Sequence, residues 1–393
     1  MYKDYNMKKI LFVCYGLGIG GIEKCLVNLL NELDSNKYEI DVLPMNPEFE
    51  LKNQIKKDIN ILNTFEYAIN TTDTFSEYLK EKNLFLKLLK ISKYIIFRLI
   101  NKFGQKPWKL FKRLNKDYDI AIAYSQNDFS PYYVIDKVKA KRKYMWYHNG
   151  AYEEEDSKYK IDKEYYVKFD KMIAVSEDCK KNLLEKFPQL QSKILILHNI
   201  INRHEIIKLS QKAQDDIFDK NTINIVSVGR LTKEKGGSLA VDICKSLSDE
   251  GYNIRWYWIG DGNQFDFLEK KIKEMNIQDK FYLLGNKINP YTYMKNCDIY
   301  VQPSYYEAYC TTTNEARILN KPIIATDVGG MREQFIDGKT GILVETDKNA
   351  IFNAIKYLLD NKEHRLQLSL NLKSMEYKFD NYINEYDKLF MER

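Results

Sequence analysis

The sequence INIVSVGRLTKEKG at residues 223–236 decides the fold. Its first six residues form a β-branched apolar run of the kind that a buried strand needs. A short polar loop follows, and Gly236 opens a helical pattern that runs to Ser248. A strand, a loop and a helix in this order are typical of a parallel βαβ unit, in which ligands bind at the carboxyl ends of the strands.

The same alternation runs along the whole chain. A polar stretch at residues 202–220 interrupts it, and we place a domain boundary there. We therefore predict an α/β fold of two Rossmann-like doubly wound domains, residues 1–200 and 201–372, with a C-terminal helix at 373–393 that packs back on the first domain. The predicted strands lie at residues 10–14, 38–43, 118–123, 143–147, 171–175, 223–228, 254–259, 281–284, 299–302, 322–325 and 341–344.

Length, composition and charge limit the classes of protein to which this chain can belong. The 393 residues suffice for two large domains, and a 44% hydrophobic composition indicates buried cores rather than disorder. The net charge of +6 is unevenly placed, because residues 82–116 contain eleven Lys or Arg and no acid. The rest of the chain sums to −5 and lacks the diffuse basic coat of a nucleic-acid binder, so we expect no nucleic-acid partner.

The cysteines and histidines indicate a cytoplasmic protein without a metal site. The six Cys contain no C-x-x-C pair, which argues against a disulfide framework, and the four His lack ligand spacing. Residues 8–15 resemble the start of a signal peptide, but a glycine-rich turn follows them and we interpret them as a first strand. The Asp117-Tyr118-Asp119 sequence has the form of a metal-binding D-x-D, and we interpret it as the entry to a strand.

A glycine-rich turn, residues 16–21, follows the first predicted strand. It fits G-x-G-x-x-G, a turn whose backbone N–H groups can meet an anionic group at a helix N-terminus. A dinucleotide-binding fold would also need an acid after the second strand, and Pro44-Met45-Asn46 supplies none. A tight turn that serves packing alone is the other interpretation.

Two further loops carry candidate chemistry. Arg230 and Lys235 lie beside a helix start and suit a diphosphate, although surface cations in a solvated loop have the same pattern. If a helix begins near Thr312, Glu307 lies in the loop before it and Glu315 about one turn inside, where both carboxylates could accept bonds from sugar hydroxyls. A helix cap and a solvated face would give the same spacing. Adjacent glycines at 329–330 could expose backbone N–H groups to an incoming oxygen.

In this order the motifs resemble glycosyltransferase family four, the retaining nucleotide-sugar transferases of the GT-B fold. The resemblance implies two facing domains with the active site in the interdomain cleft, an acceptor-binding first domain and a nucleotide-sugar-binding second domain. It covers nearly the whole chain and rests on residues 20–23, 147–149, 174–177, 198–199, 228–231, 235–236, 259–262, 298, 303–304, 307, 315, 325–330 and 333.

The resemblance also implies a role for each site residue. Arg230 and Lys235 would hold the donor diphosphate as it leaves, Glu307 would contact the donor sugar, and Glu315 would take the ribose hydroxyls. Other implied positions are His148, facing the donor sugar, and the donor-binding residues Gly20, Gly21, Tyr309, Cys310 and Thr311. The departing phosphate would help to deprotonate the acceptor hydroxyl, and no metal or other cofactor is expected.

One departure from the family pattern leaves the identity of the sugar donor open. Where the family commonly has Gly-aromatic-Gly between the glutamates, this chain has Ala308-Tyr309-Cys310. The expected activity is transfer of a hexose-type sugar from a nucleotide diphosphate sugar to a saccharide or lipid-linked acceptor, in synthesis of a surface polysaccharide such as capsule or lipopolysaccharide, or of a glycolipid. The alternatives are a GT-B epimerase or hydrolase and a non-catalytic partner subunit.

The basic segment, residues 82–116, allows two interpretations. On a helix its apolar side chains from Phe85 to Phe103 share one face, with Lys and Arg around the other. The apolar face could pack on the first domain's sheet and leave a solvated basic face. Alternatively, the segment faces an anionic membrane surface, which would make the protein peripheral on the inner face of the membrane.

Overall fold

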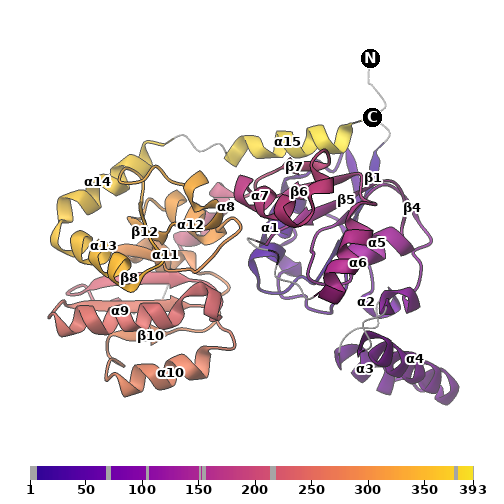
Figure 1. The fold of residues 1–393 in the computed structure, drawn as a ribbon, viewed down its shortest axis with the longest axis horizontal. Coiled ribbons are helices and arrows are strands. Elements are labelled where there is room, and N and C mark those ends of the chain that lie inside the picture. Colours follow the sequence, from indigo (N-terminus) through magenta and orange to yellow (C-terminus); the bar gives the residue numbers. More distant parts are fainter. Residues whose placement is uncertain are drawn as a thin grey trace. The chain divides into compact units, whose positions relative to one another are not determined.

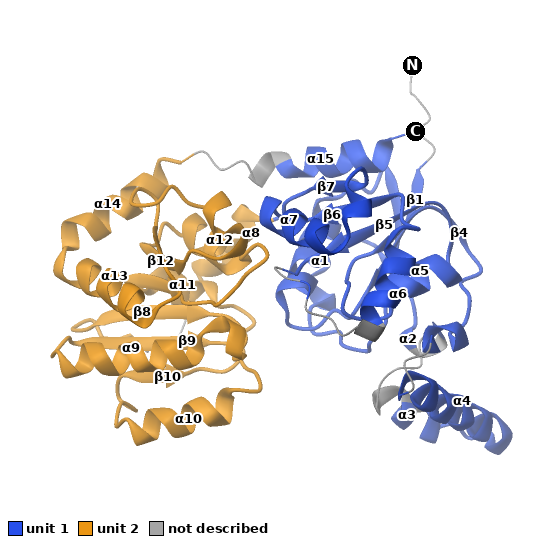
Figure 2. Cartoon of the chain, in the orientation of Figure 1, with its two compact units in different colours: residues 1–200, 381–393 blue, residues 201–380 orange. Residues whose placement is uncertain are grey.

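The computed structural model describes residues 7–67, 72–102, 106–149, 152, 156–212, 218–375 and 379–392. The chain divides into two compact units (Figure 2). Unit 1 comprises Met1–Ile200 and Asn381–Arg393, and unit 2 comprises Ile201–Asp380.

The described part of unit 1 forms a seven-stranded parallel sheet of order β3-β2-β1-β4-β5-β6-β7. The strands β1 and β4 to β7 of this sheet are labelled in Figure 1. Residues 10–13 of β1 are fully buried, as an interior strand of a doubly wound sheet requires. The strands are β1 Lys8–Cys14, β2 Tyr38–Pro44, β3 Asn60–Ile61, β4 Asp117–Ala123, β5 Lys139–Tyr147, β6 Lys171–Ala174 and β7 Ile194–Ile196.

Helices connect these strands, and the C-terminal helix α15, Phe379–Met391, packs on the same sheet. The Tyr386 ring stacks on Trp146 at 5.9 Å, its hydroxyl donates to the His198 carbonyl oxygen at 2.9 Å, and Phe390 meets Phe12 edge-on. The other helices are α1 Gly21–Glu32, α2 Thr64–Tyr67, α3 Thr72–Leu79, α4 Leu84–Lys102, α5 Ser130–Lys137, α6 Asp156–Tyr166 and α7 Glu177–Lys186, with 3₁₀ turns η1 Lys52–Gln54, η2 Pro107–Leu110 and η3 Pro188–Leu190.

Unit 2 forms a six-stranded parallel sheet of order β10-β9-β8-β11-β12-β13. Its strands are β8 Ile223–Val228, β9 Ile254–Ile259, β10 Phe281–Leu283, β11 Ile299–Gln302, β12 Ile323–Thr326 and β13 Ile342–Val344. Its helices are α8 Arg203–Ser210, α9 Gly237–Asp249, α10 Phe265–Glu274, α11 Tyr291–Asn296, α12 Thr311–Ile318, α13 Lys348–Asp360 and α14 Lys362–Lys373, with 3₁₀ turns η4 Lys233–Lys235 and η5 Gly329–Glu333.

The predicted α/β class with two doubly wound sheets is confirmed. Three predicted strands, β8, β9 and β11, have the predicted bounds. The sequence did not indicate β3 and β7, because strands of two and three residues are too short to show a period. The D-x-D carboxylates form ion pairs along the sheet, Asp117 with Lys139 at 2.7 Å and Asp119 with Lys141 at 2.6 Å.

The interpretation in which the apolar face of the basic segment packs on the sheet is wrong. The helices α3 and α4 project from the rest of unit 1 (Figure 2), and Leu84 and Phe85 on α4 are 69% and 75% exposed. Phe97 is the buried side chain of α4. Phe103 and Gly104 lie outside the described residues. Within the described ranges, no helix combines the length and apolar character needed to cross a bilayer.

Candidate active site

Two neighbouring strands of unit 2 end beside each other, and the loops that follow them carry the candidate residues. Since β8 and β11 pair in parallel, the loops that follow them leave the same edge of the sheet. The backbone N–H of Tyr305 in the second loop donates to the carbonyl oxygen of Glu234 in the first, at 2.8 Å. Residues that are about seventy positions apart in sequence therefore share one surface.

Lys235 and Glu307 form an ion pair between these two loops. The Lys235 Nζ lies 2.8 Å from both carboxylate oxygens of Glu307. The side chains are 20% and 7% exposed, so the pair is largely shielded from solvent. Burial alone would lower the pKa of Lys235, but the Glu307 carboxylate outweighs burial and raises it. The lysine is therefore a fixed cation throughout the physiological pH range.

A buried chain of hydrogen bonds orients Glu307. The Ser304 hydroxyl donates to its Oε1 at 2.7 Å, the Gln302 amide donates to Ser304 Oγ at 3.0 Å, and the Tyr300 hydroxyl donates to Gln302 Oε1 at 2.7 Å. We did not predict Tyr300 and Gln302 as site residues. The signal that could have found them is a glutamine at the end of an otherwise apolar strand.

Two glycines hold the backbone around this pair. Gly236 has φ +75°, and a Cβ there would lie 2.0 Å from the Pro303 carbonyl oxygen. Gly329 has φ +52°, and a Cβ there would lie 1.6 Å from the Glu307 carbonyl oxygen. Both positions combine a left-handed backbone with close approach to the Glu307 loop, so no other residue fits without displacing it.

The other predicted donor residues of unit 2 lie in the same two loops or the helix after them. Arg230 is exposed in the loop after β8. Glu315 lies one turn inside α12, is 3% exposed, and accepts from the Tyr291 hydroxyl at 3.2 Å. The two glutamates therefore have different partners, and the structure does not join their carboxylates directly.

The segment that departs from the family pattern is buried. Ala308, Tyr309 and Cys310 are 9%, 7% and 4% exposed. The Cys310 Sγ lies 3.2 Å from the Thr312 hydroxyl, next to Thr311 at the start of α12. Burial and then the charge of Glu307 raise the pKa of Cys310 to about 11, so the side chain is a neutral thiol.

The predicted residues of unit 1 lie after β5 and β1. His148 follows β5, its backbone N–H donates to Gln126 Oε1 at 3.2 Å, and its ring lies 4.9 Å from the Tyr124 ring. Burial lowers the pKa of His148 to about 4, so the imidazole is neutral at pH 7. Gly20 is the N-cap residue of α1 and Gly21 is its first residue; a Cβ on Gly20 would lie 2.1 Å from Glu23 Oε2.

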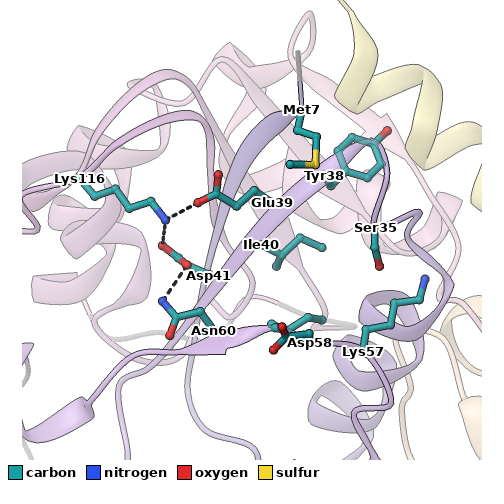
Figure 3. Close-up of a pocket in the computed structure, with 11 residues that line it drawn as sticks. Met7, Ser35, Tyr38, Glu39, Ile40, Asp41, Lys57, Asp58, Asn60 and Lys116 are labelled. Atoms are coloured by element: carbon teal, nitrogen blue, oxygen red, sulfur yellow. Dashed lines mark hydrogen bonds and ion pairs between the residues drawn. The ribbon is translucent and has the colours of Figure 1, made fainter. Parts of the chain in front are cut away.

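A separate cavity lies in unit 1, along the first half of β2 and the neighbouring β3 (Figure 3). Its volume is about 310 Å³. Buried Asp41 accepts from Lys116 at 2.7 Å, from the Tyr118 hydroxyl at 2.5 Å and from Asn60 at 3.0 Å. These bonds satisfy the carboxylate, and the cavity lies away from the strand ends that carry the predicted residues.

Comparisons with known proteins bear on this site. The family model described as "Glycosyl transferases group 1" matches residues 210–375. The chain is 28% identical to the N-acetylgalactosamine-N,N'-diacetylbacillosaminyl-diphospho-undecaprenol 4-alpha-N-acetylgalactosaminyltransferase of Campylobacter jejuni, over 95% of this chain and 96% of that one. It is 27% identical to the capsular polysaccharide biosynthesis glycosyltransferase CapM of Staphylococcus aureus, over 54% and 58%.

The chain is thus similar to group 1 glycosyltransferases. The fold agrees, because the Anabaena HepE structure in complex with UDP and glucose superposes with a TM-score of 0.73 at 14% identity, covering 98% of this chain and all of that one. The predicted GT-B fold is therefore confirmed. Arg230, Lys235, Glu307 and Glu315 fall inside the region that the family model matches, whereas His148 and the glycine-rich turn fall outside it.

Proposed function

We propose that the chain is a retaining, metal-independent glycosyltransferase. It would move a hexose-type sugar from a nucleotide diphosphate sugar to a saccharide or lipid-linked acceptor, in the synthesis of a surface polysaccharide or glycolipid. The observation that carries this proposal is the buried Lys235–Glu307 pair, which fixes a cation and a carboxylate at the carboxyl edge of the unit 2 sheet.

The pair can bind a nucleotide-sugar donor because both side chains keep unused hydrogen-bonding capacity. A lysine ammonium has three N–H donors, and the two contacts of 2.8 Å to Glu307 leave one for a diphosphate oxygen. Glu307 keeps acceptor capacity on both oxygens for sugar hydroxyls. The exposed guanidinium of Arg230, in the same loop as Lys235, would provide a second, bidentate contact to phosphate.

In the proposed reaction these cations lie where negative charge develops, on the leaving diphosphate. The bond from the anomeric carbon to the diphosphate oxygen breaks, its electron pair stays on that oxygen, and Lys235 and Arg230 stabilise the resulting anion. The acceptor oxygen forms the new bond on the same face of the sugar and gives its proton to the departing phosphate. This sequence keeps the anomeric configuration. The two cations supply the charge stabilisation, so the proposed reaction involves no metal.

The relatives support the proposed acceptor and the donor to test first. The Campylobacter enzyme is named for a diphospho-undecaprenol acceptor and an N-acetylgalactosaminyl transfer, and the HepE structure holds UDP and glucose. UDP-glucose and UDP-N-acetylgalactosamine are therefore the first donors to test. We also propose a cytoplasmic protein, peripheral on the inner face of the membrane, with the basic segment as the surface that meets anionic lipid.

A thermal-shift screen of nucleotide sugars followed by a transfer assay tests the proposal. A true donor should raise the unfolding temperature by mass action, and NMR of the product should show the donor's anomeric configuration. Lys235→Ala and Glu307→Ala should each abolish transfer in a folded protein, whereas Lys270→Ala, in an exposed pair with Glu274, should not.

Other results would refute this function. Free sugar or an epimer formed without any acceptor would indicate a hydrolase or epimerase. Donor binding without transfer to any acceptor would indicate a non-catalytic partner subunit. An inverted product, or full activity in either site variant, would overturn the mechanism.

A further inference from the structure

The outer face of α4 carries a stripe of bare apolar side chains. At about 100° per residue, this stripe spans an arc of about 140°. Its members are Leu84, Phe85, Leu88, Leu89, Ile95, Ile96 and Leu99, with exposures from 43% to 75%. Leu366 and Leu370 on α14 are exposed to a similar degree but stand as a pair, so a stripe of this length is specific to α4 among the described helices.

The other side of α4 attaches it to unit 1, which fixes the direction of the stripe. Phe97 is 1% exposed and its ring lies 5.7 Å from the rings of Phe111 and Phe129. The Tyr94 ring lies 5.0 Å from Phe75 on α3. These contacts place the helix's inner face against its own unit and turn the apolar stripe outward.

Basic side chains border the stripe on both sides. Lys93 and Arg98 are exposed and lie just beyond its two edges on the helical wheel, and Lys102 continues the border at the C-terminal end. Residues 82–116 contain no acid, and Glu81, which precedes them, pairs with Lys90 at 2.8 Å. A surface that complements this face must therefore be apolar at its centre and anionic around it.

We propose that α4 lies in the plane of an anionic lipid monolayer, with the stripe among the acyl chains and Lys93, Arg98 and Lys102 at the headgroups. The helix of 19 residues is about 28 Å long, which suits an interfacial helix, and its charges and length do not suit a span. This inference rests on the proposed function in one respect, because a lipid-linked acceptor would lie in the same bilayer.

Vesicle flotation of the full chain tests the proposal. Vesicles of phosphatidylglycerol and phosphatidylcholine should float the protein, pure phosphatidylcholine should bind it at least tenfold more weakly, and added salt should release it. Phe85→Ser/Leu88→Ser/Ile95→Ser and Lys93→Glu/Arg98→Glu/Lys102→Glu should each lower binding at least tenfold. The matched control, Leu366→Ser/Leu370→Ser, should bind as the unaltered chain does.

A site-specific fluorescent probe reports which side of α4 faces the lipid. All six native cysteines are buried, so an environment-sensitive maleimide dye would report from an introduced cysteine. Leu88→Cys, in the stripe, should give a blue-shifted emission with anionic vesicles, whereas Asn101→Cys, on the opposite side of the helix, should not.

Three results would overturn the lipid proposal. They are unchanged vesicle binding by the stripe variant, equal binding to neutral vesicles, and a lipid-free dimer that the stripe variant converts to a monomer. Transfer to a water-soluble acceptor separates this proposal from the proposed function. The stripe variant should retain that transfer, and a protein that floats but never transfers would contradict the function and leave the lipid surface standing.

Discussion

A double-mutant cycle on Lys235 and Glu307 tests the central element of the site. The variants are Lys235→Met, Glu307→Gln and the two combined. Each single variant leaves one buried group without the partner that now lies 2.8 Å away, and the combined variant removes both charges. The cycle therefore measures how strongly the two loops are coupled through this pair.

The structure sets the expected size of the coupling. At 2.8 Å and an effective dielectric constant of about 20, the Coulomb attraction is about 6 kcal/mol, and the desolvation of both ions offsets much of it. Removing one partner of a buried pair costs about 3–5 kcal/mol. Since Ser304 still donates to Glu307, we expect about 3 kcal/mol for Lys235→Met and a coupling of about 2 kcal/mol. The exposed Lys270–Glu274 pair should couple by less than about 0.5 kcal/mol.

Hydrogen exchange of the β8 and β11 amides is the appropriate assay, because it reports opening of unit 2 even if the two units unfold separately. Transfer kinetics on the same variants give the functional half of the test. Lys235→Met should lower kcat by about 10²–10³, because it removes a cation that acts on the leaving phosphate. A coupling below about 1 kcal/mol, or an unchanged kcat, would refute the reasoning.

Three further predictions concern the pKa of His148, the glycine beside Glu307 and the metal requirement. Burial lowers the pKa of His148 to about 4, so the unfolded chain binds an extra proton between about pH 6.5 and 4 and unit 1 loses about 3 kcal/mol as the pH falls through that window. His148→Gln should remove this slope in pH-dependent urea unfolding, whereas the exposed His204→Gln should keep it. Gly329→Ala should displace Glu307 and lower transfer about 100-fold, while Gly251→Ala, with φ +86° and no described atom within 4 Å of its Cβ, should cost about 1 kcal/mol of stability and no activity. Transfer should persist in a chelating agent, and a loss that added Mg²⁺ restores would contradict metal independence.

The periodicity of apolar residues was sufficient to predict most of the strands and the α/β class of the fold. The strands β8, β9 and β11 were predicted to the residue, because β-branched and aromatic residues dominate them. The strands β1, β2, β4, β5 and β12 were predicted with ends that differ from the structure by one to four residues. The short edge strands β3 and β7 were not, since two or three residues carry too little pattern. The α4 helix was predicted as amphipathic, but its periodicity is the same whether the apolar face is covered or bare.

The sequence by itself determined which residues can carry the chemistry. It placed Arg230, Lys235 and Glu307 in loops after predicted strands and Glu315 in the helix that follows, since glycines, charges and apolar runs are local signals. Only the tertiary structure decided which of them meet. Lys235 and Glu307 are 72 residues apart, and they pair because β8 lies beside β11, an order that local propensity does not encode. The same holds for Glu315, whose carboxylate accepts from Tyr291 and not from the partners of Glu307, and for the α4 stripe, which is exposed because its own unit contacts the opposite face.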